Sequence, residues 1–403
     1  MKINWKKIGA MVGVVLMLTG CTGNLSGSTE NLMKDVRVSR TESVCDESFG
    51  AAARSFALSL FQQMNAAENT LISPVSAMTA LGMTVLGARS KTAAQMYNLF
   101  GMDADTLHAS LRAWRAQLPS GKSTAEMAQS MWFRTGFSVC DDFLTQNAQY
   151  YDAGVFRAPF DQSTVSDINR WTSGKTKDRI PKLLDQLPTG AQMVLINALA
   201  FDGKWDKPFE TDGTFDEIFT RADGTEQSVP MMHGKASHYI ETDHAYGFRK
   251  SYTDGYAWIA VLPKAGNAAE LADALNEAEF AEMLTAYTPA EVQVTMPKFR
   301  TEYTVRLNDA LKALGMTDAF TVSADFSGIS PDPLCIDEVL QKTFMETDES
   351  GTKAAAATAV IGKATACAPG ETVEVVLDQP FLYFVVDSEN VPLFCGVMQS
   401  VNP

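Results

Sequence analysis

The sequence predicts an α+β fold in one large domain. Segments whose apolar residues recur at helical spacing are interleaved with short apolar runs typical of strands, and the C-terminal part of the chain is almost entirely strand-like. No repeat and no linker-like stretch follows residue 48. We therefore assign residues 49–403 to a single domain of about 350 residues, although chains of that length often split into two.

The helical segments begin directly after residue 48. Phe49, Ala53, Phe56 and Leu60 are spaced as on one face of a helix. A second helix is expected in "SPVSAMTALGMTVLGA", where Ser73 suits the N-cap and a proline follows in the first turn. Further helices are expected at 91–100, 104–117, 141–151, 164–176, 268–286 and 305–314.

The strand-like runs lie between these helices and after them. "MMHG" at 231–234 is expected to close a strand. Strands are expected at 125–133, 191–205, 257–263 and 292–299, and in the C-terminal runs "VEVVLDQPFLYFVVD" and "PLFCGVMQ".

The N-terminus has the composition of an export signal. Three lysines precede the apolar run Ile8–Leu18, which is too short to span a bilayer. The ending Leu-Thr-Gly-Cys resembles a bacterial lipobox, so we expect residues 1–20 to be removed and Cys21 to carry lipid, followed by a flexible tether over 21–48. The alternative is an ordinary secretory signal in which Cys21 is incidental.

These features predict the location of the protein. We expect export across the inner membrane of a Gram-negative bacterium, with lipid anchorage at the outer membrane or cell surface. The six cysteines have no close spacing, so no disulfide framework is expected despite export.

The charge balance argues against nucleic acid as a partner. The formal net charge is −15, and it falls to −18 when the three lysines of residues 1–20 are removed. His108, Arg112 and Arg115 share one side of the expected helix 104–117. They represent either a small polyanion site or an ordinary solvated face.

Motifs for catalysis and for cofactors are missing. The chain has no Gly-x-Ser-x-Gly, His-Glu-x-x-His or Gly-x-Gly-x-x-Gly, and its two Gly-Lys-[Ser/Thr] triplets lack the preceding glycine of a phosphate loop. His233, His238 and His244 lie close in sequence, but 233 and 238 point to opposite faces of a strand. Solvated loop histidines are the alternative to a zinc site, and we expect no catalytic residue, metal or cofactor.

Several segments resemble the serpin family of serine protease inhibitors. They are "NTLISPVSAMTALGMTVLGARSKTAAQM", "INALAFDGKWDKPF", "MPKFRTEYTVRLNDALKALGMTDAF" and "DQPFLYFVVDSENVPLFCGVMQSVNP". The likeness covers residues 49–403 in the family's order. It implies a monomer with three mixed β-sheets, about nine α-helices and an exposed reactive-centre loop over residues 349–373.

The resemblance implies a function for "DESGTKAAAATAVIGKATACAPGE" at 348–371. In inhibitory serpins a protease cleaves this loop and forms an acyl-enzyme, and the loop then inserts into the main sheet and traps the enzyme. The family's spacing puts the scissile bond at Thr365–Ala366, which suits elastase-like or subtilisin-like proteases. Lys363 offers a trypsin-like protease a second bond, and papain-like cysteine proteases remain open as targets. The implied hinge consists of Glu349, Gly351, Thr352, Ala354, Ala355, Ala356, Ala357 and Thr358.

The residue pattern of the loop agrees with insertion as a strand. If Thr352 faces inward, the inward set is Thr352, Ala354, Ala356, Thr358, Val360 and Gly362, all small or β-branched. Lys353 and Lys363 then share the outer face, and a one-residue shift would bury both. The alternatives are a mobile surface loop or an Ala-rich helical turn, as in non-inhibitory relatives.

The resemblance also identifies residues that control sheet opening. Ser73, Ser76 and Asn197 match a gating cluster in which Gln341 replaces the family's histidine. Trp205 and the pair Glu349 and Lys298 match the region called the breach, at the top of the sheet. Lys353 departs from the family's usual glutamate. The rival interpretations are a non-inhibitory binding or storage serpin, and an enzyme of unknown chemistry.

Overall fold

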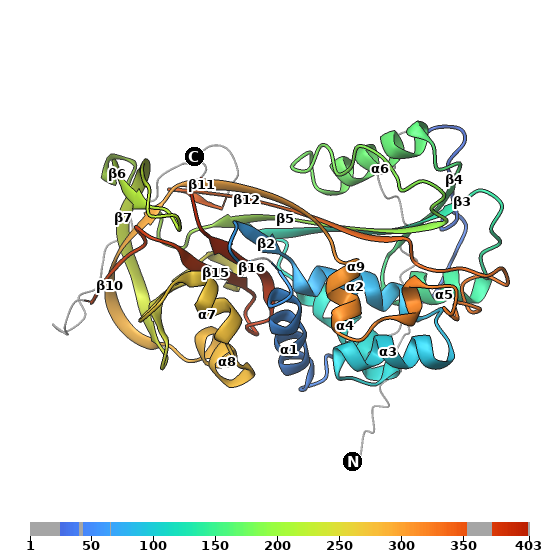
Figure 1. Cartoon of the computed structure of the whole chain (residues 1–403), viewed down its shortest axis with the longest axis horizontal. Helices are drawn as coiled ribbons and strands as arrows, with labels where there is room; N and C mark the ends of the chain where they lie inside the picture. Colours follow the sequence, from blue (N-terminus) through green and yellow to red (C-terminus); the bar gives the residue numbers. More distant parts are fainter. Residues whose placement is uncertain (1–24, 40–42, 65, 353–372, 402–403) are drawn as a thin grey trace, which may run out of the picture.

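The computed structural model of the chain describes residues 25–39, 43–64, 66–352 and 373–401 (Figure 1). Within these ranges it has nine α-helices, as expected. They are α1 (Phe49–Phe61), α2 (Pro74–Val85), α3 (Ser90–Phe100), α4 (Ala104–Gln117), α5 (Asp141–Tyr150), α6 (Gln162–Lys175), α7 (Ala268–Ala274), α8 (Glu277–Thr285) and α9 (Asn308–Ala313).

The strands of the described residues include every expected run and several that the sequence did not indicate. They are β1 (Glu30–Asn31), β2 (Thr70–Ile72), β3 (Thr124–Arg134), β4 (Gly154–Ala158), β5 (Met193–Lys204), β6 (Thr214–Thr220), β7 (Glu226–Glu241), β8 (Ala245–Ser251), β9 (Ala257–Pro263), β10 (Thr288–Pro297), β11 (Phe299–Arg306), β12 (Glu338–Asp348), β13 (Gly351–Thr352), β14 (Val373–Val376), β15 (Phe381–Val386) and β16 (Pro392–Met398).

The strands form a seven-stranded and a nine-stranded sheet. The first has the order β1-β4-β3-β5-β13-β12-β11. The second has the order β14-β10-β7-β8-β9-β15-β16-β2, with β6 also paired to β7. Strand β7 joins two parts of this sheet, because residues 231–239 pair with β10 and residues 238–241 pair with β8. The three expected sheets correspond to the seven-stranded sheet and these two parts.

Helices cover both faces of the seven-stranded sheet. In Figure 1, α6 lies on one face and α2, α5 and α9 lie on the other. Val165, Ile168 and Trp171 of α6 pack against Trp132 and Phe156 of the sheet. Every residue of α2 is buried, as expected for a helix enclosed by other elements.

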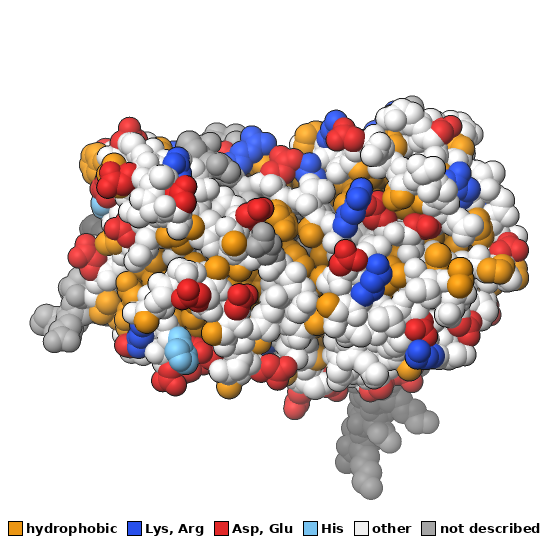
Figure 2. Space-filling model, in the orientation of Figure 1, with side chains coloured by type: hydrophobic (Ala, Val, Ile, Leu, Met, Phe, Trp, Pro, Cys, Tyr) orange, Lys and Arg blue, Asp and Glu red, His pale blue; other side chains and the backbone are white. Residues whose placement is uncertain are grey.

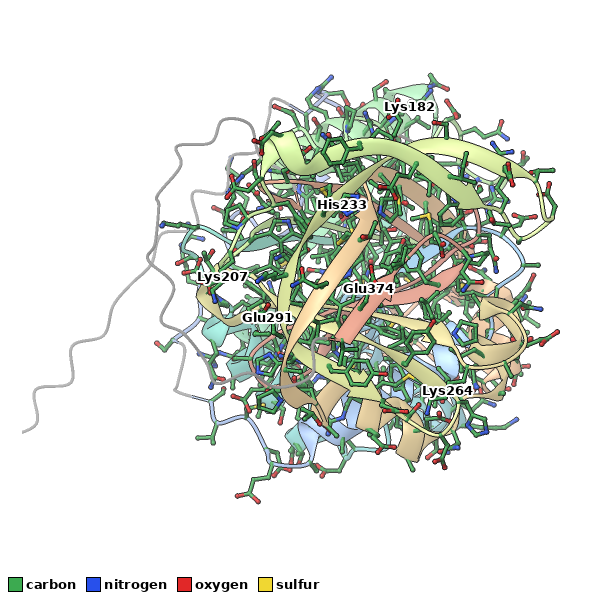
Figure 3. The ribbon with its side chains drawn as sticks, turned by 90° about the vertical axis from the view of Figure 1, so that its left-hand side faces the viewer. Lys182, Lys207, His233, Lys264, Glu291 and Glu374 are labelled. Carbon is green, nitrogen blue, oxygen red and sulfur yellow. The ribbon has the colours of Figure 1, made fainter. Side chains whose placement is uncertain are left out.

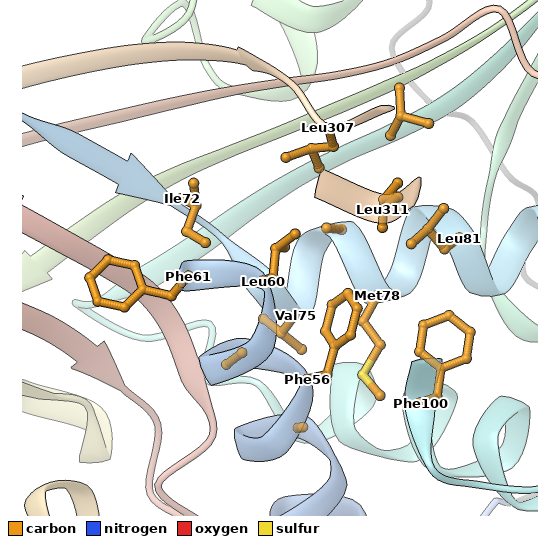
Figure 4. Packing of buried hydrophobic residues seen from close by; sticks show 14 of the residues in the cluster. Phe56, Leu60, Phe61, Ile72, Val75, Met78, Leu81, Phe100, Leu307 and Leu311 are labelled. Atoms are coloured by element: carbon orange, nitrogen blue, oxygen red, sulfur yellow. The ribbon is translucent and has the colours of Figure 1, made fainter. Parts of the chain in front are cut away.

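The main core lies between α1, α2 and the neighbouring elements. Its residues drawn and labelled in Figure 4 are Phe56, Leu60, Phe61, Ile72, Val75, Met78, Leu81, Phe100, Leu307 and Leu311. All of them are buried and apolar, so burial away from water stabilises this arrangement. The core holds α2 directly below the central strands of the seven-stranded sheet.

Several expected elements have different boundaries, and the strand expected at 292–299 spans the end of β10 and the start of β11. The single helix expected at 268–286 is two helices, because Leu275 leaves the helical conformation and Asn276 caps α8 by accepting from the Glu279 amide. Residues 305 and 306 continue β11, and α9 begins only at Asn308. "MMHG" at 231–234 lies in the middle of β7 and does not close a strand, because it pairs with β10.

The expectation of a flexible tether is wrong for residues 25–39. Glu30 and Asn31 form β1 and pair with β4 at the edge of the seven-stranded sheet. Ser26 donates to the buried carboxylate of Asp167 from its amide (2.9 Å) and its hydroxyl (2.5 Å). A polar composition suggested a loop, but these long-range hydrogen bonds hold the segment against the domain.

Candidate functional site

The functional site is centred on the hinge strand β13. It lies between β5 and β12 and is antiparallel to both. Gly351 pairs with Lys204 of β5 and with Asp348 of β12, and Thr352 pairs with Gly203 and Thr347. Below it, β5 and β12 pair directly and in parallel, from Glu338 to Phe344 of β12. The two central strands are therefore apart at one end and closed along the rest of their length.

Thr352 is buried, as the sequence register predicted. Its hydroxyl is 2.5 Å from that of Tyr252, which follows β8, and 3.4 Å from that of Thr347. Burial raises the pKa of Tyr252, so the phenol keeps its proton. Tyr252 was not singled out from the sequence, because nothing local marks a tyrosine after a strand as a contact of a hinge 100 residues away.

Trp205 holds the hinge from the side of β5. Its indole Nε1 donates to the carbonyl of Asp348 (3.0 Å), and its amide donates to that of Ser350 (3.1 Å). Its ring stacks on Tyr252 with centroids 4.1 Å apart and planes within 6°. The two aromatic side chains thus form one surface against which the hinge lies.

The expected ion pair between Glu349 and Lys298 is present. Lys298 Nζ lies 2.8 Å from one carboxylate oxygen of Glu349 and 3.0 Å from the other, and Thr214 Oγ1 donates to the carboxylate at 2.8 Å. Burial alone would raise the pKa of Glu349, but the bonds from Lys298 and Thr214 hold it below its usual value. The ion pair fixes Glu349, which lies in the turn between the end of β12 and β13.

The gating residues form one buried hydrogen-bond network between α2, β5 and β12. Gln341 Nε2 donates to Asn197 Oδ1 (3.0 Å) and to the Ser73 carbonyl (2.9 Å), and its Oε1 accepts from the Ser73 amide (2.9 Å). Ser76 Oγ donates to Asn197 Oδ1 at 3.0 Å. Gln341 thus joins α2, β5 and β12 through three bonds without carrying a charge.

Gln129 of β3 belongs to the same network. Its Nε2 donates to Ser76 Oγ at 3.0 Å, and its side chain is buried. Sequence reasoning missed it, although a glutamine inside an otherwise apolar strand is an available signal, because a buried amide needs a partner. The network therefore extends across three neighbouring strands.

Several predicted site residues lie outside the described residues. They are Cys21, Ala354, Ala355, Ala356, Ala357, Thr358, Lys363, Thr365 and Ala366. Their assigned roles stay predictions.

The basic face expected on α4 is wrong at His108. This side chain is buried between Tyr97 and Tyr151, whose hydroxyls lie 3.0 and 2.5 Å from its ring nitrogens. Burial lowers the pKa of His108 to about 4, so the ring is neutral at pH 7. Arg115 donates to the Tyr151 carbonyl, which draws this cation toward α5.

The three clustered histidines do not converge. His233 bonds to Glu217 (2.7 Å), His238 to Ser237 (2.9 Å) and His244 to Glu279 (2.9 Å). Figure 3 shows His233 on the face formed by β7, β10 and β14, where Glu291 and Glu374 also lie. Across residues 25–39, 43–64, 66–352 and 373–401, no three His, Cys, Asp or Glu side chains are grouped as metal ligands would be.

Acidic and basic side chains are interspersed over the face shown in Figure 2. None of the helices in the described ranges has the length and apolar character needed to cross a bilayer. The four cysteines described, Cys45, Cys140, Cys335 and Cys395, are free thiols.

Comparison with known proteins identifies the family. The family model described as serpin (serine protease inhibitor) matches residues 51–403. The chain belongs to the serpin family. It is 31% identical to leukocyte elastase inhibitor A of Mus musculus, over 84% of this chain and 95% of that protein. It is also 29% identical to an uncharacterized serpin-like protein of Methanosarcina mazei, over 96% of this chain and 95% of that protein.

Solved structures agree with this assignment. The native state of tengpin, a thermophilic serpin, superposes with a TM-score of 0.88 at 38% sequence identity, over 93% of this chain and all of that one. The latent state of tengpin gives a TM-score of 0.78 at 36% identity. The α+β serpin fold is thereby confirmed. Family members are in general protease inhibitors.

Proposed function

We propose that this serpin inhibits serine endopeptidases as a suicide substrate. The observation that carries the proposal is β13, whose two residues lie between β5 and β12 in the orientation that a longer inserted strand would have. A strand added at this position gains hydrogen-bond partners on both sides. A chain that served only as a binding protein would not need a hinge already seated between its central strands.

The pairing of β13 extends naturally into the loop. If its register with both neighbours continues, Thr358 comes to lie opposite Asn197 on β5 and Gln341 on β12. Insertion would then break the bond between Gln341 Nε2 and Asn197 Oδ1, and the Thr358 hydroxyl would enter the buried network. In the same register Lys353 and Lys363 stay on the face opposite to Thr352.

The covalent chemistry belongs to the protease. Its serine hydroxyl adds to the carbonyl carbon of Thr365, and the C–N bond to Ala366 breaks as the Ala366 nitrogen takes a proton from the enzyme's acid. An ester then joins the serine to Thr365. Inhibition requires the loop to insert before water hydrolyses this ester.

Insertion supplies the free energy that holds the enzyme. Each new backbone hydrogen bond contributes about 1 kcal/mol net, so about a dozen bonds contribute roughly 10 kcal/mol. The small side chains of the hinge can enter between two closed strands with little displacement, since four of its residues are alanines.

The residues around the proposed bond indicate the protease class. Ala364, Thr365 and Ala366 suit the small primary pockets of elastase-like or subtilisin-like enzymes. One relative bears the name leukocyte elastase inhibitor A, which supports this choice. Lys363 would serve a trypsin-like enzyme at the bond to Ala364, and papain-like cysteine proteases are a further class to test.

We also propose that the protein acts at a membrane surface as a monomer. The supporting observation is the lipobox-like ending at Cys21, which follows a typical export signal. Lipid on Cys21 would hold the serpin at the outer membrane or cell surface of a Gram-negative bacterium. Metabolic labelling with a fatty acid analogue tests this directly, with Cys21→Ser as the control.

A mixing experiment tests the inhibitory mechanism. Residues 22–403 are incubated separately with pancreatic elastase, subtilisin and trypsin, and the products are analysed on denaturing gels and by mass spectrometry. An SDS-resistant covalent band and a released peptide beginning at Ala366 are expected. A band with trypsin and a peptide beginning at Ala364 would move the bait to Lys363. Clean cleavage without a band from all three enzymes contradicts the proposal for these protease classes.

Thr352→Arg tests the direction of insertion. A guanidinium on the buried face would face Tyr252 and Thr347, so insertion slows and the protease escapes by hydrolysis. The expected result is a stoichiometry of inhibition raised by about tenfold or more. Lys353→Arg, at the neighbouring position on the opposite face, is the matched control and should inhibit like the wild type. Equal stoichiometry for both variants would show that the register is wrong.

A further inference from the structure

Lys250, near the end of β8, is a buried cation beside the hinge. Only 4% of its surface is exposed. Its Nζ donates to the carbonyl of Lys235 on β7 at 2.8 Å. The same ammonium lies 4.3 Å from the ring centroid of Phe209 and 5.5 Å from that of Trp205. A buried ammonium loses its hydration, and aromatic faces replace part of it.

Both rings belong to the segment that holds the hinge. Trp205 donates to the carbonyls of Asp348 and Ser350, and the Phe209 amide donates to that of Glu349 at 2.9 Å. The rings contact each other edge to face, with centroids 6.0 Å apart. The segment from Trp205 to Phe209 therefore donates hydrogen bonds to the carbonyls of three successive residues, 348–350, while its two aromatic side chains face Lys250.

The Phe209 ring packs against the backbone of β7 at Gly234. A Cβ at Gly234 of β7 would lie 2.6 Å from the Phe209 ring, so only glycine leaves room for the ring at this position. The chain thus brings Phe209 onto β7, next to the Lys235 carbonyl that accepts from Lys250. The cation lies where it contacts the carbonyl and both rings at once.

The charged form of Lys250 prevails at neutral pH. Burial, and to a smaller extent nearby Lys207, lowers the pKa of Lys250 to about 8, with Asp206 opposing part of the effect. The ammonium occupies a position that disfavours charge, where an apolar side chain would be easier to bury. That cost is offset only if the ammonium makes its contacts with the carbonyl and the rings.

We propose that Lys250 is a positioning residue for the hinge: its ammonium holds Trp205 and Phe209 in the orientation in which they bind residues 348–350 and, through the Trp205–Tyr252 stack, receive Thr352. Among the described residues, Lys250 acts on residues 348–350 through Trp205 and Phe209, which its ammonium contacts. Its effect on inhibition rests on the proposed function, whereas its effect on the hinge concerns the free protein.

Hydrogen–deuterium exchange of the free serpin tests this role. The reporting amides are those of Trp205 and Phe209 and the Gly351 amide, which donates to Asp348 Oδ1 at 3.1 Å. Lys250→Met keeps the length of the side chain and removes the charge, and Lys250→Gln also keeps a donor for the Lys235 carbonyl. Lys264→Met is the matched control, because Lys264 is exposed, pairs with Glu241 and lies far from Lys207 on the face in Figure 3.

The expected result is local. Exchange in peptides covering residues 204–210 and 347–352 should rise by about tenfold in Lys250→Met, while peptides of α1 and β16 keep their wild-type rates. Lys264→Met should match the wild type throughout. Wild-type exchange at the hinge in both Lys250 variants would overturn the proposal. If Lys250→Met does not fold, Lys250→Gln decides between the two results.

The outcome is separable from that of the inhibition assay. Faster hinge exchange in Lys250→Met together with a wild-type protein that forms no covalent complex would leave this inference in place and reject the proposed function. Unchanged exchange together with a normal covalent complex would reject this inference and leave the proposed function in place.

Discussion

Gln341 joins the two central strands and α2 in one buried hydrogen-bond network. It sits on β12, makes three hydrogen bonds to α2 and β5, and is completely buried. Its amide offers both donors and an acceptor and stays neutral at every physiological pH. The histidine that the resemblance implies at this position in the family would titrate near neutrality, whereas Gln341 does not titrate.

Gln341→His should restore sensitivity to pH. An imidazole in this buried neutral network has a pKa below its unfolded value of about 6.5, because burial disfavours the charged ring. Its contribution to stability is present above that value and is lost as the pH falls through the folded pKa. The melting temperature of the variant should therefore drop relative to the wild type between about pH 7 and pH 5. A difference that stays constant over this range contradicts the prediction.

Glu349→Gln should weaken the breach. The variant loses the ion pair with Lys298 but keeps the size of the side chain, so we expect a loss of about 1 kcal/mol in unfolding free energy at pH 7. The folded pKa of Glu349 is lowered, so its contribution is present above the unfolded value of about 4.3 and disappears as the pH falls below it. Urea unfolding at pH 7 and pH 3.5 measures both effects. A cycle with Lys298→Met isolates the pair, and full additivity would show that the pair contributes nothing.

Strand β13 is the element that makes this serpin's central sheet asymmetric. It fills the gap between β5 and β12 at one end only, while the two strands pair directly over the remainder. Gly351 allows the chain to enter this gap. Its φ of +154° is rarely adopted by residues with a side chain, and a Cβ there would lie 1.9 Å from the Gly203 carbonyl oxygen. The hinge can enter the sheet because it begins with a residue that has no side chain.

Gly351→Ala should drive the hinge out of the sheet. The added methyl group cannot fit against Gly203, so Thr352 loses its contact with Tyr252 and the stability falls by about 1–3 kcal/mol. Exchange of the Gly203 and Lys204 amides should rise accordingly. Gly174→Ala is the control, because its Cβ would have nothing within 4 Å and it lies in α6. A crystal structure of the variant with β13 still in place would contradict this.

At the scale of the whole molecule, the proposed mechanism requires the closed central sheet to admit a further strand. Only two residues of the loop region occupy the gap in the described structure, and β5 and β12 would have to separate along seven register pairs to admit more. The segment 25–39 adds a strand to the far edge of the same sheet, and the buried Asp167 accepts hydrogen bonds from Ser26 and Thr29. Strand β1 thereby covers part of the edge strand β4, at Phe156 and Arg157.

Cleavage of the loop should raise the melting temperature sharply. Roughly 10 kcal/mol of new backbone bonds, at about 2 °C per kcal/mol for a chain of this size, correspond to a rise of about 20 °C. Differential scanning calorimetry of the serpin before and after nicking with subtilisin measures this. Thr352→Arg should show a much smaller rise. An unchanged melting temperature in the wild type would favour a non-inhibitory binding or storage serpin.

The boundaries of most elements follow from local signals. Helices α3 and α4 begin and end within a residue of the positions expected, because Asp103 caps α4 and Gly101, in a left-handed conformation, ends α3. Short strands such as β2, β4 and β13 carry no comparable signal, because two to five residues are stabilised by their neighbours in the sheet and not by their own preference. The break between α7 and α8 was also missed, although Asn276 is a good N-cap.

The residues of the candidate site likewise divide into those that could be identified from the sequence and those that could not. Thr352 could be assigned to the buried face because alternation along a strand and the two lysines leave one sensible register, and the structure confirms that burial. Ser73, Ser76, Asn197, Gln341, Trp205, Lys298 and Glu349 came from resemblance. Gln341 bonds to Asn197 and Ser73, and Lys298 pairs with Glu349, while the roles of these residues in sheet opening stay predictions. Tyr252, Gln129 and Lys250 escaped notice, since each is defined by contacts with residues far away in the sequence.

Local chemistry in the chain was thus enough for most helices, for the longer strands and for the burial of Thr352, whereas the fold class came from the resemblance. Its composition suggested a free N-terminal tether and a cationic His108, and both were wrong within the described residues. Tertiary structure alone decided that residues 25–39 pair with β4, that His108 is neutral and that β13 already lies between β5 and β12. The reason is physical: hydrogen bonding within a helix and alternation along a strand act over a few residues, whereas burial, protonation and strand pairing depend on partners that only folding brings together.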